Sequence, residues 1–365
     1  MFRPPATEGR DAGAGSFATK PIALSSDRIV YLDGWRGCSI LLVLIGHFGL
    51  LPTIHGKDFY TARAGVEAFF VLSGRLMAEI LFLREMPIRT FYWRRFSRIF
   101  PAYAALIVIL GMLGIINAFD ALTAFTFTAN YLYPSYLYPS GYIDHIWSLC
   151  VEEHSYLILG VVAYSWRDRF SKETLPTVLL LLAAAMMTNG AIQTWIFHRG
   201  YYDVYWHSDV RGASVLISAG TYLLVERRSL SPWIPVTAAT IGLATLIPGS
   251  IPDPIKYTLG TSLLAIGICT MDAAWTWVRS ALSIKPLCMV GLWSFSLYLW
   301  QQPYFLQLPA MSKPVLLVAT FATAIVSYYA IERPARSYLN SLKLSKPHSP
   351  RLVEIRIKRR VDRIE

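Results

Sequence analysis

Charged side chains are scarce in this sequence of 365 residues. Only 16% of the residues are charged, whereas 54% are hydrophobic. An ordinary soluble domain carries roughly 25% charged residues, so a soluble fold would need one very large and almost uncharged core. Long apolar runs recur between residues 37 and 334, which favours an integral membrane protein.

Cysteine is also rare, and no two cysteines are closely spaced. The four are Cys38, Cys150, Cys269 and Cys288, each in or beside an apolar run. This spacing excludes a disulfide framework and a cysteine-based zinc site, and we expect no metal cofactor.

A cleavable signal is missing from the amino-terminal region. Residues 1–27 are rich in Gly, Ala, Ser and Pro and contain no apolar stretch of the kind that a signal peptide needs. We predict that they form a disordered cytoplasmic segment and that the first helix itself directs insertion.

The net charge of +11 raises the alternative of a nucleic-acid-binding protein. The basic residues, however, cluster between the apolar runs and near the carboxyl terminus, and they form no surface interleaved with aromatic residues. This pattern is typical of cytoplasmic loops beside anionic lipid, so we expect membrane lipids as partners and no nucleic acid.

Ten apolar runs approach or reach the length of a transmembrane helix, which is about 17–25 residues. They cover residues 37–54, 65–83, 99–117, 145–165, 176–196, 212–226, 233–248, 257–276, 287–306 and 314–332. The sequence therefore predicts an all-α integral membrane protein, a bundle of about ten transmembrane helices. Residues 118–133 are also apolar, and we interpret them as a re-entrant or interfacial segment instead of an eleventh span.

The distribution of Lys and Arg predicts the orientation of the bundle. If the amino terminus is cytoplasmic, the inner segments hold 27 of these residues and the outer loops hold 6. Because cytoplasmic loops are enriched in them, both termini are expected inside. The predicted organisation is a cytoplasmic segment 1–27, a transmembrane domain 28–340 and a basic cytoplasmic tail 341–365. The tail is either an amphipathic surface helix on anionic lipid or a solvated segment.

Ionisable residues inside the membrane are functional candidates, because each costs about 2.5–3.5 kcal/mol to insert. The apolar runs contain His47, Glu67, Arg75, Glu79, Glu152, Glu153, His154 and Asp272. Such buried groups suit either catalysis or a proton relay in a transporter.

Arg36 and His47 lie on nearly the same face of the first helix, about 16 Å apart. That face would carry a cation near the cytoplasm and an imidazole deep in the membrane. Histidine is the usual proton acceptor in acyl transfer. The alternative is a histidine that only hydrogen-bonds to a neighbouring helix.

Arg94, Arg95 and Arg98 open the third apolar run. Clustered guanidinium groups at a cytoplasmic helix start suit a phosphorylated ligand, because each can bind phosphate through two hydrogen bonds. On these residues alone, ordinary anchoring of a cytoplasmic helix end is the simpler interpretation.

Glu152 and Glu153 are adjacent and therefore point in different directions on a helix. At least one of them should face a cavity or a cationic partner. A carboxylate there could orient an imidazole or accept a hydroxyl proton. The alternative is a structural salt bridge, for instance with Arg75.

Six motifs together resemble the membrane-bound acyltransferase 3 family of the glycan O-acetyltransferase type. In the order of that family they are YLDGWRGCSILLVLIGHFG (31–49), GVEAFFVLSGRLM (65–77), FYWRRFSRIFPAY (91–103), HIWSLCVEEHSYLI (145–158), SFSLYLWQQP (294–303) and IERPAR (331–336). The resemblance implies a multi-pass protein of the bacterial inner membrane. It also implies transfer of an acetyl group from cytoplasmic acetyl-CoA to a hydroxyl of an extracytoplasmic glycan.

The resemblance also implies site residues. His47 matches the family's essential histidine, and Glu152 matches a conserved glutamate. We predict that His47, Glu152 and Glu153 are catalytic. The predicted donor-binding residues are Arg36, Ser73, Arg75, Arg94, Arg95 and Arg98.

Two positions depart from the family pattern. Gln301 replaces a histidine that usually follows Leu-Trp, which leaves His47 as the better base. Arg75 stands where an aromatic or apolar residue is common, and we expect Glu79 or Glu152 to be its partner.

The predicted mechanism uses His47 as general base on the acceptor hydroxyl, with Glu152 either orienting the imidazole or stabilising its cation. A transient acyl-histidine is the variant. The acceptor is an exopolysaccharide, an O-antigen, a lipo-oligosaccharide or peptidoglycan. Aromatic residues that either stack on sugar rings or form an interfacial belt are Tyr131, Tyr133, Tyr136, Tyr138, Tyr142 and Trp147. The alternative functions are a polytopic transporter or an export-complex subunit for a glycan precursor.

Overall fold

A computed structural model describes residues 29–51, 60–132, 141–166, 173–308 and 310–344. Within these ranges the chain is helical and contains no strand. The predicted cytoplasmic segment 1–27 and most of the predicted tail 341–365 lie outside the described residues.

The helices follow one another with short connections. The first seven are α1 (Val30–His47), α2 (Thr61–Ala78), α3 (Ile88–Met112), α4 (Ala118–Phe125), α5 (Ala129–Leu132), α6 (Trp147–Trp166) and α7 (Leu175–Trp195). The next five are α8 (Tyr201–Tyr205), α9 (Ser208–Arg211), α10 (Ala213–Val225), α11 (Trp233–Leu246) and α12 (Asp253–Ile255). The last five are α13 (Thr261–Cys269), α14 (Thr276–Leu282), α15 (Lys285–Phe305), α16 (Lys313–Ser327) and α17 (Arg333–Leu344).

Three π-helical turns interrupt this pattern. They are Glu79–Leu83 after α2, Lys256–Gly260 before α13 and Tyr328–Glu332 between α16 and α17. A π-helical turn inserts an extra residue into a helix and often marks a functional site.

Each of the ten predicted apolar runs overlaps a helix, although run 37–54 continues past the end of α1 and run 257–276 past the end of α13. In the part of the chain that the structure describes, four helices are long and apolar enough to cross a membrane, namely Ile88–Met112, Asp144–Trp166, Leu175–Trp195 and Lys313–Leu342. A fifth is added if α14 and α15, which meet at 54°, form one broken span. The fold class is therefore confirmed as all-helical with several candidate spans, whereas ten spans and the inward termini stay predictions.

The central helices are too short or too highly charged to count among these candidate spans. Helix α2 carries Arg63, Glu67 and Arg75, while α10 and α13 contain only 13 and 9 residues. Charged groups and helix breaks thus gather in the interior of the bundle, where neighbouring helices can satisfy them.

The apolar segment 118–133 does not form one long helix. Asn117 begins α4 with a capping box that includes Asp120, and α4 ends after eight residues. Phe127, with a φ of 53°, separates it from the four residues of α5. Neither helix is long enough to cross a bilayer, which agrees with an interfacial or re-entrant segment.

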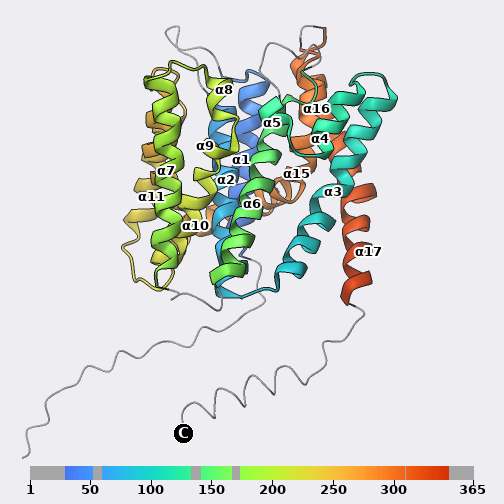
Figure 1. The fold of residues 1–365 in the computed structure, drawn as a ribbon. Helices are drawn as coiled ribbons and strands as arrows, with labels where there is room; N and C mark the ends of the chain where they lie inside the picture. The colour runs from blue at the N-terminus through green and yellow to red at the C-terminus, as the bar shows by residue number, and fades with distance from the viewer. Residues whose placement is uncertain (1–28, 52–59, 133–140, 167–172, 309, 345–365) are drawn as a thin grey trace, which may run out of the picture.

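The helices stand roughly upright beside one another (Figure 1). Helices α7, α10 and α11 lie on the left of the view, α1, α2 and α6 in the centre, and α3, α16 and α17 on the right. The start of α1 and the end of α17 face the same, lower side.

Glycines allow α1 to approach α14 and α15 closely. A Cβ atom at Gly34 would collide with the carbonyl oxygen of Leu282, and one at Gly291 would collide with that of Asp33. Small residues at such crossings let two backbones touch, which is the usual basis of helix packing in membranes. This contact fixes the turn of α1 that carries Arg36.

Candidate functional site

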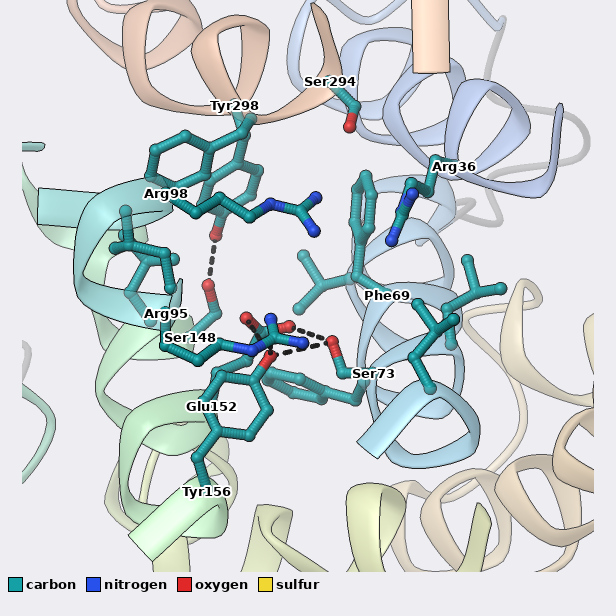
Figure 2. A pocket seen from close by; sticks show the side chains of 17 residues that line it. Arg36, Phe69, Ser73, Arg95, Arg98, Ser148, Glu152, Tyr156, Ser294 and Tyr298 are labelled. Atoms are coloured by element: carbon teal, nitrogen blue, oxygen red, sulfur yellow. Dashed lines mark hydrogen bonds between the residues drawn. The ribbon is translucent and has the colours of Figure 1, made fainter. Parts of the chain in front are cut away.

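A cavity, here called the chamber, lies among α1, α2, α3, α6 and α15 (Figure 2). Much of its wall is apolar, including Val66, Phe69 and Leu72 of α2. Its polar groups come from all five helices, so the chamber exists only when segments far apart in the sequence have packed together.

One wall of the chamber holds a hydrogen-bonded carboxylate. The Ser73 hydroxyl donates to Oε1 of Glu152 at 2.8 Å, and the Tyr156 hydroxyl donates to Oε2 at 3.0 Å. The guanidinium of Arg95 lies 4.7 Å from the centre of the Tyr156 ring (Figure 2). Both oxygens of Glu152 are therefore occupied, and the carboxylate ties α6 to α2 and faces a cation from α3.

Two further arginines point into the chamber from opposite sides (Figure 2). Arg36 forms a 2.9 Å ion pair with Asp33, one turn earlier on α1. Arg98 has no hydrogen-bond or ion-pair partner among the described residues, and its electrostatic neighbours include the like charges Arg36 and Arg95. This convergence of cations leaves positive charge available for an anionic ligand.

Tyr298, here called the Tyr298 barrier, is the last residue of α15 that lines the chamber. Its hydroxyl donates to the carbonyl oxygen of His145 at 2.8 Å and shares a 2.6 Å hydrogen bond with Ser148. The ring packs edge-on against Phe69, with 6.4 Å between centroids. Because Gln301 follows Tyr298 by three residues on α15, it lies about 4.5 Å further along the helix, outside the chamber.

His47 lies beyond the Tyr298 barrier. Its Nδ1 atom is 2.7 Å from Oε1 of Gln301, and its ring stacks on Phe305 at 5.1 Å. The imidazole therefore pairs with an amide, whereas Glu152 hydrogen-bonds to two hydroxyls in the chamber. The expectation that Glu152 orients His47 is wrong for this conformation, because Gln301 takes that place at Nδ1 and Glu152 bonds to Ser73 and Tyr156 instead.

A chain of amides fixes which His47 nitrogen carries the proton. The Gly141 carbonyl can only accept, so the Gln302 side chain presents Nε2 to it, at 2.9 Å. Oε1 of Gln302 then accepts from Nε2 of Gln301 over 3.5 Å, which leaves Oε1 of Gln301 for His47. His47 must donate from Nδ1, and its Nε2 lone pair remains free to accept a proton.

His145 is a second buried histidine near His47. Its side chain is 4% exposed, neither ring nitrogen has a hydrogen-bond partner within the described residues, and His47 lies within electrostatic range. Its ring packs edge-on against Tyr298 at 5.4 Å. The barrier is thus flanked by two imidazoles.

A second cavity of about 1210 Å³, here called the vestibule, adjoins the chamber. The two cavities share Arg36, Leu76 and Arg98 as lining residues. The vestibule lies toward the start of α1 and α17, because Asp33 and Arg336 also line it. The two cavities are therefore neighbours, and the stretch from the vestibule through the chamber to Tyr298 is here called the path.

The structure brings together five of the nine predicted site residues. Arg36, Ser73, Arg95, Arg98 and Glu152 all line the chamber.

The other four lie elsewhere. His47 is beyond the barrier, as described above. Arg94 is exposed and lines neither cavity. Glu153 also lines neither, and its buried Oε1 has no hydrogen-bond partner within the described residues.

Arg75 points away from the chamber. It follows Ser73 by two residues, which turns it about 200° around α2. Its guanidinium forms a 2.9 Å ion pair with Asp272 and a 3.1 Å hydrogen bond to the Tyr31 hydroxyl. The prediction of Glu79 or Glu152 as its partner is therefore wrong, and Glu79 instead pairs with Arg84.

Glu67 makes contacts that hold helices together. It forms a fully buried ion pair with Arg211 and accepts a 2.6 Å hydrogen bond from Thr261. The guanidinium of Arg211 lies 3.8 Å from the Tyr257 ring centre. These contacts tie α2 to α9 and α13 and place no free group in the chamber.

The described aromatic residues of the 131–147 region are engaged within the protein. Tyr131 donates to Asp209 at 3.1 Å, and the Tyr142 hydroxyl accepts from Gln307 at 2.9 Å. Trp147 stacks on Trp206 with 5.8 Å between centroids. The remaining predicted members, Tyr133, Tyr136 and Tyr138, lie outside the described residues.

Sequence reasoning missed the residues that connect the predicted ones. Tyr156 lies one turn after Glu152, so helical spacing could have placed it on the same face. His145 opens the motif that contains Glu152, and Tyr298 lies within the motif that contains Gln301. No sequence signal links Gln301 to His47, because 254 residues separate them.

Comparisons with known proteins identify the family of this chain. A family model described as an acyltransferase domain matches residues 29–332. The peptidoglycan O-acetyltransferase OatA of Listeria monocytogenes is 26% identical, over 86% of this chain and 57% of the relative. The O-acetyltransferase OatA of Staphylococcus aureus is 25% identical, over 84% of this chain and 57% of the relative.

The chain spans a little more than half the length of these curated relatives. No solved structure matches it.

Proposed function

Because the chain belongs to the acyltransferase family whose domain covers residues 29–332, we propose that it is a membrane O-acyltransferase. In this proposal it moves an acetyl group from cytoplasmic acetyl-CoA to a hydroxyl of an extracytoplasmic glycan. The names of the two relatives, both O-acetyltransferases and one of them of peptidoglycan, support a glycan as acceptor.

The observation that carries the mechanism is the 2.7 Å contact between His47 Nδ1 and Gln301 Oε1. It leaves Nε2 as a lone pair in an interior of mostly apolar side chains. A positioned general base contributes about 10²- to 10⁴-fold to the rate of a proton-transfer step. Gln301 takes the orienting role that a carboxylate has in a Ser-His-Asp triad.

The reaction is a direct acyl transfer. Nε2 of His47 takes the proton of the acceptor hydroxyl while that oxygen attacks the thioester carbonyl carbon. This attack forms the C–O bond of a tetrahedral intermediate, which then collapses, re-forming the carbonyl group and breaking the C–S bond. The imidazolium returns its proton to the departing thiolate, so free CoA and the O-acetylated glycan leave and His47 is neutral again.

The donor would lie along the vestibule and the chamber. Arg36 and Arg98, where the two cavities meet, would hold phosphate groups. The chamber would take the uncharged pantetheine arm, whose amides can bond to Ser73 and Tyr156. Eleven residues of α1 separate Arg36 from His47, about 16 Å, and an extended pantetheine arm has a comparable length. Tyr298 must move aside for the thioester to reach Nε2.

The same proposal includes ten spans with both termini in the cytoplasm. The count of 27 inner against 6 outer Lys and Arg supports it. The vestibule then opens on the side where CoA is found, and His47 lies toward the side of the glycan.

The test is a His47→Asn variant in membrane vesicles supplied with labelled acetyl-CoA and glycan acceptor. The asparagine amide can still donate to Gln301 but cannot act as a base. We expect transfer to fall by about 10²-fold or more. His198→Asn is the matched control, because His198 is exposed and has a φ of 50°, which asparagine tolerates. Normal transfer by correctly inserted His47→Asn protein would overturn the mechanism.

A further inference from the structure

The vestibule carries arginines that the reaction above does not use. Besides Arg36 and Arg98 at the chamber entrance, it is lined by Arg84 and Arg336. Arg336 belongs to the IERPAR motif and is exposed in the first turn of α17. Two of the three π-helical turns border this cavity, through Glu79 and through Glu332. The irregular helix geometry is therefore concentrated around this set of cations.

Acidic residues do not neutralise these cations completely. Arg84 pairs with Glu79, and Arg36 pairs with Asp33. Glu332 hydrogen-bonds to Ser296 at 2.8 Å and lies within electrostatic range of Arg98 and Arg336. Four arginines thus face three carboxylates in this cavity. Arg336 has no ion-pair partner among the described residues, yet it lies within electrostatic range of Arg98. An excess of guanidinium groups in a shared cavity favours a ligand with several negative charges.

The order of charges along the path restricts the shape of that ligand. The chamber leads to the barrier and is mainly apolar, with Arg95 bound to Tyr156 on its wall. The first cations along the path are Arg98 and Arg36, the latter paired with Asp33, and Arg336 lies further out. A matching ligand has an uncharged arm, then one anionic group, then a second anionic group beyond it.

We infer that Arg336, assisted by Arg84, binds the 3′-phosphate of CoA, while Arg36 and Arg98 bind its diphosphate. This inference rests on the proposed function and names the part of the donor that the vestibule recognises. The protein would select the complete nucleotide thioester over thioesters that lack the terminal phosphate monoester. Anionic lipid offers similar phosphate chemistry at the membrane surface, so the experiment must separate the two sources.

The experiment measures equilibrium binding of CoA and of dephospho-CoA, which lacks only the 3′-phosphate, to the full chain in phosphatidylcholine nanodiscs. We expect the wild-type protein to bind CoA roughly tenfold more tightly than dephospho-CoA, because one charge-assisted hydrogen bond contributes about that much. The Arg336→Gln variant should lose most of this preference, because its affinity for CoA should fall while its affinity for dephospho-CoA should stay the same. Arg227→Gln is the control, since it removes an exposed arginine that lines no described cavity and should change neither affinity.

Three results would overturn the inference. The first is that the wild-type protein binds the two nucleotides with equal affinity. The second is that Arg336→Gln lowers the affinity for both nucleotides by the same factor. The third is an effect of Arg336→Gln that appears only when phosphatidylglycerol is added, which would assign Arg336 to lipid. Binding is independent of turnover, so discrimination without acetyl transfer would instead contradict the proposed function and leave the phosphate subsite standing.

Discussion

Gln301 shows how one side chain can set the chemistry of another. The amide has no acid–base role of its own, but its fixed orientation leaves His47 with a single tautomer. An acceptor oxygen at this position is what matters, and either an amide or a carboxylate can supply it. A histidine here, as the family usually has, would need its own hydrogen-bond partner to give the same result.

We predict that Gln301→Ala lowers kcat by roughly tenfold or more, because the loss of orientation removes part of the contribution of a general base. The KM for acetyl-CoA should stay the same, since Gln301 lies outside the chamber. Gln301→Glu keeps the acceptor oxygen and should retain most of the rate. Steady-state kinetics on the two variants measures this.

The control is Gln307→Ala, which removes a hydrogen bond to Tyr142 further along the chain. It should leave kcat unchanged. If Gln301→Ala and Gln301→Glu lose activity equally, the tautomer explanation does not hold.

The sequence was sufficient to select His47, Arg36, Ser73 and Glu152 as candidates, because each stands in a motif. It could not supply their partners. Asp272, the partner of Arg75, is 197 residues away, and helical periodicity carries no information about contacts at that separation.

At the scale of elements, the tight contact between α1 and α15 determines where Arg36 lies. Gly291 sits against the Asp33 carbonyl, so even one methyl group must push the helices apart. Overpacking of this kind typically costs about 1–3 kcal/mol. Asp33 is also the ion-pair partner of Arg36, so the displacement reaches the chamber entrance.

We predict that Gly291→Ala lowers the thermal midpoint of the detergent-solubilised protein and weakens CoA binding. Gly111→Ala is the matched control on α3, where a Cβ meets no atom within 4 Å. That change should leave stability equal or raise it by up to about 1 kcal/mol, because alanine is the better helix former. A Gly291→Ala protein as stable as the control would show that the helices can separate without loss.

The apolar runs were readable from the sequence because hydrophobic length alone marks a candidate span. The helix breaks could not be predicted from the sequence, since a π-helical turn depends on neighbouring groups that hydrogen-bond to its displaced backbone. Tyr328–Glu332 lies inside an apolar run that the sequence presents as uninterrupted.

At the scale of the whole molecule, the orientation in the membrane decides which substrate reaches which cavity. Ser229 and Ser250 flank α11 on either side and are both exposed. With the proposed topology, Ser229 lies in the cytoplasm and Ser250 outside.

We predict that a membrane-impermeant maleimide labels Ser250→Cys in intact cells and labels Ser229→Cys only after permeabilisation. The native cysteines are replaced in the background protein so that each variant has one thiol. The reverse pattern, or labelling of both sites from outside, would refute the inward orientation and with it the cytoplasmic donor.

The Tyr298 barrier has a consequence for the energy metabolism of the cell. An aqueous passage from the vestibule to His47 would join the two sides of the membrane, and protons would run down their gradient through it. In the proposed mechanism, the hydrogen bonds from Tyr298 to Ser148 and to the His145 carbonyl would keep that passage closed. A pantetheine arm in the chamber would then block the passage in its turn, so that an acetyl group could cross while protons could not.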